Sequence, residues 1–166
     1  MKNLLLFSLL LGSGIAIGQI GVSFTPAISS VEKSNLAFNT GIFYEIKVWD
    51  SNFTIGFDAG ITSEIQNSEY SEESGLIYPR KERVSMGFNG KGYFPHDNFD
   101  SYLGMGVGYL MPNNLRESIE GLISFDAGIR KDKWKTGLKF EYVPSIERVL
   151  IGISISYALT KRLQSP

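Results

Sequence analysis

Apolar and polar residues alternate with a period of two over most of the chain after residue 18. Successive side chains of a β-strand point to opposite faces, so this period produces a strand with one apolar face and one polar face. The pattern therefore predicts an all-β fold. In the segment 36–48 the apolar or aromatic positions, with one threonine among them, are Leu36, Phe38, Thr40, Ile42, Tyr44, Ile46 and Val48.

Eight segments carry this alternation, and each is about ten residues long or longer, which is the length a tilted strand needs to cross a bilayer. An open sheet edge in lipid would leave unpaired backbone groups, so the sheet is expected to close on itself. We predict an eight-stranded antiparallel up-and-down transmembrane β-barrel. Its strands are expected at 19–28, 35–49, 52–63, 82–94, 101–111, 118–130, 133–143 and 148–160.

The first 18 residues differ from the rest of the chain. Lys2 provides a positive charge, the segment 4–11 is almost entirely apolar, and the small residues Ala16 and Gly18 precede Gln19 at the positions that signal peptidase reads. The apolar segment is shorter than the ~20 residues of a membrane-spanning helix. We predict a signal peptide over residues 1–18, with cleavage before Gln19, and a barrel domain over residues 19–166.

The connections between the predicted strands alternate in length. Outer-membrane barrels have short turns on the periplasmic side and longer loops on the outer side. The pattern thus predicts insertion in the cell outer membrane, with the strand ends at 19 and 160 on the periplasmic side. The short connections are 49–51, 95–100 and 131–132, and the longer ones are 29–34, 62–81, 112–117 and 144–147.

Composition excludes several classes of function. The chain has no cysteine, which rules out a lipid-anchoring cysteine, disulfides and thiolate zinc sites. A formal net charge of -1 provides no basic surface for nucleic acid. With a single histidine, only carboxylates would remain as metal ligands. We therefore expect no metal, no cofactor and no nucleic-acid partner.

The direction of the apolar face decides between two kinds of eight-stranded barrel. A soluble lipocalin-like barrel, periplasmic or secreted, places the apolar face inside, around an apolar ligand. An eight-stranded barrel has room inside only for a packed set of side chains. Large apolar residues on every strand would overfill it, whereas the other face carries many glycines and serines. We favour the apolar face outward, toward lipid, and keep the lipocalin-like barrel as the alternative.

Charged residues of both signs lie on the predicted inward face. Charges removed from water require partners, so we predict that they form an ion-pair network that plugs the lumen. A catalytic or transport pathway is the other interpretation of the same charges. The predicted network consists of Glu45, Lys47, Asp58, Arg83, Lys91, Glu120, Asp126, Arg130, Lys139 and Glu141, and Lys135 lies on the same face.

Two further segments, together with the strand pattern and the signal peptide, resemble the small outer-membrane barrels of the OmpA/OmpX type: Gly104-Met105-Gly106-Val107-Gly108-Tyr109 and the apolar run 151–159. The resemblance covers the whole chain after the signal peptide. It implies contact with outer-membrane lipid and insertion by the outer-membrane assembly machinery, which reads the last strand. The chain departs from this class at its end, where 160–166 follow the strand instead of a terminal aromatic residue.

The connection 62–81 is the longest and is rich in acidic residues. Long loops often carry binding sites, and many are simply solvated. We consider it a possible contact site for an envelope or surface protein, with a solvated loop as the alternative. The candidate contact residues are Glu69, Tyr70, Glu72, Glu73, Tyr78 and Arg80.

Lipid-modifying enzymes also occur among eight-stranded outer-membrane barrels. Their chemistry requires a histidine base beside a serine or an acid. The single histidine, His96, lies in the short turn 95–98, on the periplasmic side and away from the outer leaflet. We therefore predict no catalytic residue and no enzymatic activity, and a structural or surface-interaction role. A lipid-modifying enzyme remains the third hypothesis.

Overall fold

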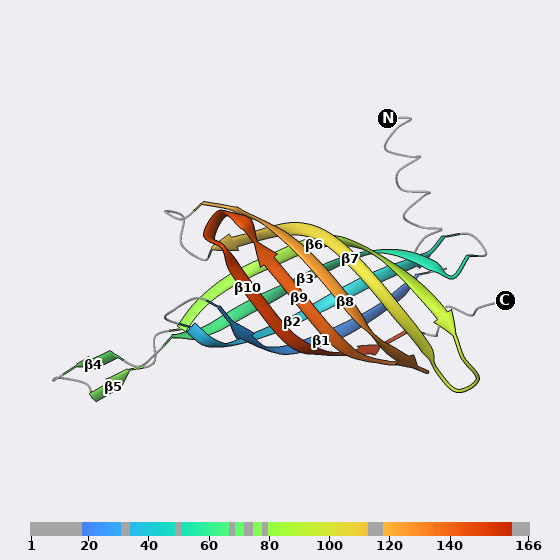
Figure 1. The fold of residues 1–166 in the computed structure, drawn as a ribbon, viewed down its shortest axis with the longest axis horizontal. Helices are drawn as coiled ribbons and strands as arrows, with labels where there is room; N and C mark the ends of the chain where they lie inside the picture. Colours follow the sequence, from blue (N-terminus) through green and yellow to red (C-terminus); the bar gives the residue numbers. More distant parts are fainter. Residues whose placement is uncertain are drawn as a thin grey trace.

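The computed structural model describes residues 18–30, 34–48, 51–66, 69–71, 75–77, 80–112 and 118–160. Eight of its strands form one closed antiparallel barrel (Figure 1). This confirms the predicted all-β, eight-stranded up-and-down topology, while residues 1–17 of the predicted signal peptide lie outside the described residues. The barrel strands are β1 (Gln19–Ser29), β2 (Ser34–Lys47), β3 (Phe53–Gln66), β6 (Arg80–Pro95), β7 (Asp100–Pro112), β8 (Glu120–Lys131), β9 (Trp134–Val143) and β10 (Arg148–Ala158).

The first and last strands close the barrel. β1 pairs with β10, for example through Val22 and Tyr157, and each other barrel strand pairs with its neighbours in sequence order. Closure leaves no barrel strand with an unpaired edge. In the described part of the chain, no helix has the length and apolar character needed to cross a membrane.

The two ends of the barrel differ in their connections (Figure 1). We call the end where β2, β6 and β8 finish, and where Gly18 and Thr160 lie, the turn end. The opposite end is the loop end, and the last connection there holds a short 3-10 helix, η1 (Pro144–Ile146).

The connection predicted as one loop over 62–81 is more ordered than expected. β3 and β6 continue to pair beyond Thr62 as far as Ile65 with Arg80. Two further short strands, β4 (Glu69–Ser71) and β5 (Gly75–Ile77), form a separate antiparallel sheet beyond the barrel (Figure 1). Each added pair satisfies further backbone groups, which explains why the ladder extends past the expected strand ends.

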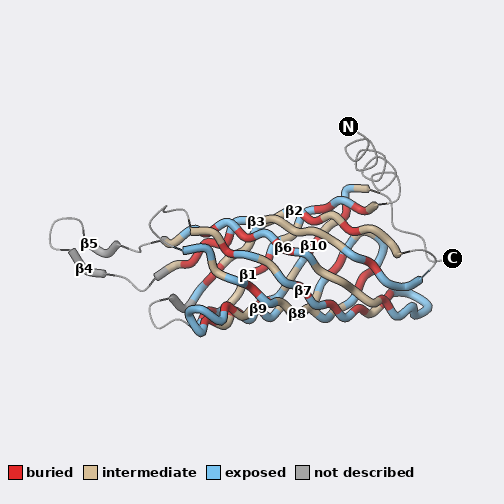
Figure 2. Tube along the Cα trace, turned by 90° about the horizontal axis from the view of Figure 1, so that it is seen from above, coloured by how far each residue is buried: buried red, intermediate tan, exposed pale blue. Residues whose placement is uncertain are grey.

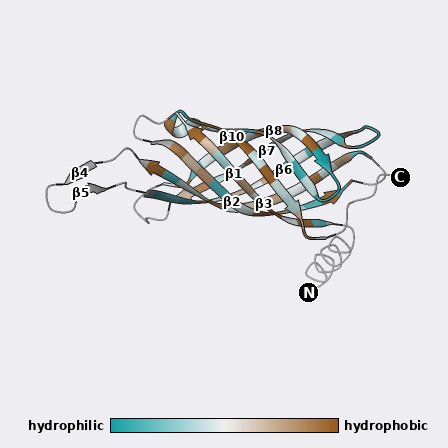
Figure 3. Ribbon diagram, turned by 90° about the horizontal axis from the view of Figure 1, so that it is seen from below, coloured by the Kyte–Doolittle hydropathy of each residue, from teal (hydrophilic) through white to brown (hydrophobic). Residues whose placement is uncertain are grey.

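The barrel wall has an apolar outer face and a polar inner face. Along β7, the outward Leu103, Met105 and Val107 are each more than 60% exposed, whereas Tyr102, directly before Leu103 in the sequence, is buried. Figure 2 shows the same alternation of buried and exposed residues along the strands, and Figure 3 shows the matching alternation of hydropathy. The apolar side chains therefore point away from the lumen, as the size argument predicted.

Glycines on the inner face lie directly opposite one another on neighbouring strands. Gly128 pairs with Gly137, and a side-chain carbon at Gly137 would overlap the backbone carbonyl of Ala127. Glycine permits the close backbone approach of a sharply curved sheet. These positions let a small barrel close and leave interior volume for long charged side chains.

Candidate functional site

The centre of the lumen is organised around one carboxylate, that of Glu45 on β2, which is 0% exposed. Its Oε1 accepts hydrogen bonds from Lys135 Nζ at 2.7 Å and from Lys91 Nζ at 3.0 Å. The hydroxyl of Tyr93 donates to Oε2 at 3.0 Å. Both oxygens of this buried charge are therefore satisfied, which is the condition for keeping an ion away from water.

The two lysines that reach Glu45 have further partners. Lys91 Nζ lies 3.1 Å from Asp126 Oδ2 and 5.7 Å from the centre of the Tyr102 ring. Lys135 Nζ lies 3.8 Å from the centre of the Phe43 ring. An aromatic face attracts a cation, and the attraction grows when the cation is desolvated. The cluster thus ties β2, β6, β7, β8 and β9 together across the lumen.

A second ion pair lies nearer the turn end, between Arg130 and Asp100. Asp100 Oδ2 accepts hydrogen bonds from Arg130 Nε at 3.0 Å and from Arg130 Nη2 at 2.7 Å. The Arg130 guanidinium also stacks over the Tyr93 ring, 3.9 Å from its centre. Through Tyr93 this pair joins the Glu45 cluster. Together they form the turn-end cluster: Glu45, Lys91, Tyr93, Asp100, Arg130 and Lys135.

The loop end contains a second group of charges. Arg83 Nη1 donates to Glu120 Oε2 at 2.9 Å, and Lys139 Nζ lies 2.8 Å from Glu141 Oε1. Beside them, buried Leu110, Leu122 and Val143 form an apolar cluster. The loop-end cluster of charges comprises Glu64, Arg83, Glu120, Lys139, Glu141 and Arg148.

Arg148 is the least satisfied member of the loop-end cluster. Its Nη1 lies 2.6 Å from Glu64 Oε1, but among the described residues none of the three guanidinium nitrogens has a partner in hydrogen-bonding geometry. Within the described residues, the contact between Arg148 and Glu64 is therefore an ion pair that lacks hydrogen-bond geometry. Both residues are nearly fully buried.

Between the two clusters lies a polar cavity of about 40 Å³, lined by serines and by charged residues that include Asp58 and Asp126. The Asn89 side chain donates to Asp58 Oδ1 at 2.6 Å. Cavities that hold small-molecule ligands are typically about 300–1,000 Å³. This space is far below that size, so the central lumen is packed rather than hollow.

Most of the predicted network residues belong to these contacts. Lys47 lies at the end of β2, two residues from Glu45 and on the same face of the strand. Lys135, Asp100, Glu64 and Arg148 were not in the predicted network. Glu64 is in phase with the inward Asp58 and Thr62, but it fell in a segment predicted as loop. Ion pairs among the described residues join these members of the predicted network: Glu45, Arg83, Lys91, Glu120, Asp126, Arg130, Lys139 and Glu141.

The candidate contact residues of the longest connection are only partly described. Glu69 and Tyr70 belong to β4, where they pair with Ile77 and Leu76. Arg80 begins β6 and pairs with Ile65. Glu72, Glu73 and Tyr78 lie outside the described residues. The structure thus places part of this segment on a separate two-stranded sheet.

His96 has a hydroxyl neighbour in the turn between β6 and β7. Its Nε2 lies 3.1 Å from Ser101 Oγ, and its ring lies 4.7 Å from that of Phe99. A nucleophilic serine also needs a carboxylate to orient the histidine and donors for the oxyanion. The nearby Asp100 carboxylate binds Arg130 inside the lumen instead. The pair is exposed at the turn end.

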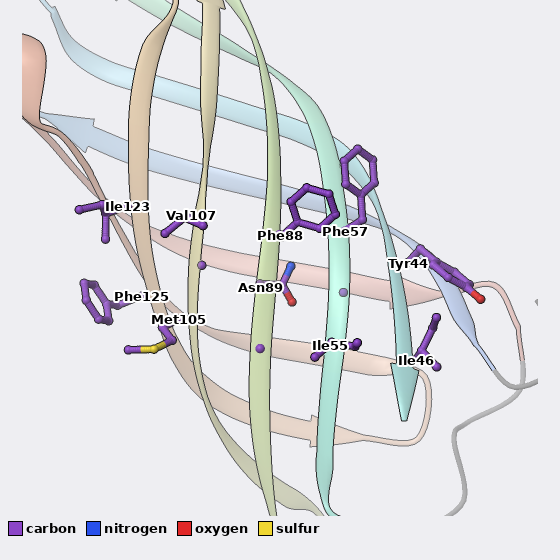
Figure 4. Close-up of a pocket in the computed structure, with 13 residues that line it drawn as sticks. Tyr44, Ile46, Ile55, Phe57, Phe88, Asn89, Met105, Val107, Ile123 and Phe125 are labelled. Carbon is purple, nitrogen blue, oxygen red and sulfur yellow. The ribbon is translucent and has the colours of Figure 1, made fainter. Parts of the chain in front are cut away.

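An apolar hollow of about 670 Å³ lies on the outside of the wall (Figure 4). Ile55 and Met105 border it from β3 and β7, and on β6 the position between them in the register is Gly90, which has no side chain. Phe57 and Phe88, in edge contact with a ring separation of 5.5 Å, border it on another side. The outer face is thus apolar but not smooth.

No three His, Cys, Asp or Glu side chains gather into a metal site within the described segments. No protein-family model matches the sequence, and no curated protein matches it. The proposed function therefore rests on the contacts in the lumen and on the polarity of the two faces of the wall.

Proposed function

We propose that this protein is an outer-membrane β-barrel with a structural or surface-interaction role, no catalytic activity and a lumen plugged by its ion-pair network. The observation that carries the proposal is the apolar outer face. Soluble proteins rarely expose contiguous apolar patches larger than a few hundred Å². Here exposed apolar side chains occur on all eight barrel strands. A hydrocarbon solvent accounts for such a surface.

The height of this apolar belt supports the proposal. On β6 the exposed apolar side chains extend from Val84 to Phe94. At about 3.3 Å per residue and a strand tilt of about 40°, this stretch covers about 25 Å along the barrel axis, which is the height of the apolar band of outer-membrane barrels. Exposed aromatic residues lie near its edges, with Phe53 and Trp134 at the turn end and Tyr109 toward the loop end.

The inner face argues against a lipocalin-like barrel. Such a barrel needs an apolar interior with room for a ligand. The central lumen here holds Glu45, Lys91 and Lys135 in direct contact, and the cavity beside them measures about 40 Å³. The same contacts favour a closed lumen over a solute channel, because a passing solute would have to separate buried ion pairs.

Membrane fractionation tests the proposal. The full chain expressed in a Gram-negative host is expected in the outer-membrane fraction, extractable only with detergent. The purified barrel is expected to show no steady conductance in planar bilayers. Recovery in the soluble fraction without detergent would overturn the membrane assignment. A steady current through folded protein would overturn only the plugged lumen.

The possible partner needs a separate experiment. Purification of the full chain from native membranes in mild detergent is expected to retain any envelope protein bound at the loop end. Deletion of 67–79, which removes β4 and β5 and leaves the pairing of Ile65 with Arg80, is the matched control. A partner retained equally by both proteins would show that this segment is not the contact site.

A further inference from the structure

Three residues at the turn end form one row across three strands. Lys131 on β8 lies directly opposite Trp134 on β9, and Trp134 lies directly opposite Tyr157 on β10. Residues directly opposite one another in a sheet share a face. Trp134 is 57% exposed and Lys131 is exposed, so this face is the outer one.

A second lysine joins this row from the turn between β8 and β9. Lys133 Nζ lies 5.8 Å from the centre of the Tyr157 ring, and the Tyr157 and Trp134 rings are 4.8 Å apart. The turn is sharp, with Asp132 in the left-handed region at φ 53°. The Asp132 carboxylate offsets one lysine, which leaves one net positive charge beside two aromatic rings. We call Lys131, Lys133, Trp134 and Tyr157 the basic–aromatic row.

We propose that the basic–aromatic row binds the phosphate of an anionic phospholipid in the leaflet at the turn end. This inference rests on the proposed membrane location. Tryptophan and tyrosine rings occupy the level of the headgroups, and lysines beside them attract anionic lipid. The lysine ammonium groups thus lie at the level of the lipid phosphates.

The wall next to the row can accommodate the lipid chains. On the outer face of β10, Ile155 is the next side chain after Tyr157 in the direction away from the turn end. Ile153, one outward position further, pairs with Leu138 on β9. All three are exposed. A lipid whose phosphate contacts the lysines would therefore lay its hydrocarbon on a continuous apolar surface. The lysines at the rim match the anionic headgroup of such a phospholipid, and the apolar wall beside them matches its hydrocarbon chains.

The turn between β6 and β7 at the same end provides an internal contrast. The segment 92–99 contains no lysine or arginine, and it carries an acidic residue, Asp97. Its exposed Phe94 and Phe99 give it aromatic character without positive charge. The contrast predicts that anionic lipid collects at β8–β10 and not around the whole rim.

Trp134 can report on its own lipid neighbours. The chain has two tryptophans, so Trp49→Phe leaves Trp134 as the single fluorophore. This variant is reconstituted in mixed phosphatidylglycerol and phosphatidylcholine bilayers in which one lipid at a time is brominated and quenches nearby tryptophan. We expect phosphatidylglycerol to be enriched about fivefold over phosphatidylcholine at Trp134, the effect of about one net charge near a membrane surface.

Lys131→Gln combined with Lys133→Gln leaves the Asp132 carboxylate without its lysines and is expected to reduce this ratio to below one, and Asp97→Asn is the matched control that leaves the ratio unchanged. The preference should also weaken as salt increases, because salt screens exposed charges. Insertion is measured on the same samples by circular dichroism and the heat-dependent gel shift. A folded, inserted barrel with no preference, or with a preference that survives the lysine substitutions, overturns this inference alone. Failure to insert in either lipid overturns the proposed membrane function as well.

Discussion

Both ends of the lumen bury charged side chains, but the two ends differ in how completely hydrogen bonds satisfy those charges. In the turn-end cluster, both oxygens of Glu45 accept hydrogen bonds, and aromatic rings cover Lys135 and Arg130. In the loop-end cluster, Arg148 and Glu64 are also buried and lie 2.6 Å apart, but among the described residues no Arg148 nitrogen has a partner in hydrogen-bonding geometry. A buried ion pair is stabilising only when hydrogen bonds satisfy its donors and acceptors. The turn end should therefore be the more stable half of the barrel.

The difference follows from which strands carry the two ion pairs. Asp100 and Arg130 at the turn end lie directly opposite one another on the paired strands β7 and β8. At the loop end, Arg148 on β10 and Glu64 on β3 meet across the lumen from strands that are not neighbours in the barrel. A more tightly positioned backbone allows hydrogen-bond geometry that charge attraction alone does not impose.

The largest expected effect is from Glu45→Ala. It would leave the ammonium groups of Lys91 and Lys135 buried without their shared carboxylate, at a cost of about 3–5 kcal/mol in the free energy of unfolding. Urea unfolding of the barrel in detergent micelles or thin bilayers measures it. Glu64→Ala is the matched substitution at the loop end and should cost less. Equal losses for the two variants would remove the distinction between the ends.

A smaller effect is expected in double-mutant cycles on one arginine pair from each end. Arg130→Met with Asp100→Asn removes two hydrogen bonds, and the coupling energy should be about 2 kcal/mol. Arg148→Met with Glu64→Gln should show a coupling of about 1 kcal/mol or less. The equilibrium unfolding of all variants provides the values. A larger coupling at the loop end would reverse the comparison.

Hydrogen exchange of the backbone amides should show the same difference in stability between the two ends, without any substitution. Along β6, amides near Tyr93 are expected to exchange with solvent deuterium about tenfold more slowly than amides near Arg83, since local opening requires breaking the local contacts. Hydrogen-exchange mass spectrometry of the reconstituted barrel resolves the two halves of the strand. Uniform protection along β6 would indicate that strand pairing, and not the lumen, sets local stability.

The smallest expected effect is from His96→Ala at the turn end. It removes two exposed contacts, to Ser101 and to the Phe99 ring, and should change neither unfolding nor lipid composition. Phospholipid and lipid A profiles of cells expressing the two proteins would test this. A lipid change caused by the wild-type protein and lost in the variant would instead support a lipid-modifying enzyme.

Several inward-facing charges of the lumen could be predicted from odd or even position along a strand alone, which we call parity. Glu45, Lys91 and Arg130 occupy inward positions of strands with a clear period of two. Glu64 has the right parity but lies where the apolar signal has ended, and Asp100 lies in a segment predicted as a turn. Parity identifies a face, but it does not show how far a ladder continues or which charges meet. Pairing Glu45 with Lys135, 90 residues away, requires the register of the closed barrel.

By itself, the sequence determined the number of barrel strands, their order of connection and the polarity of each face, because a period of two is a local property of each segment. Only the tertiary structure decided how the charges are partnered, which of them have complete hydrogen bonds, and which lysines join Trp134 and Tyr157 at the rim. Those contacts depend on register and closure, which bring together residues that are distant in the chain and leave no local trace in it.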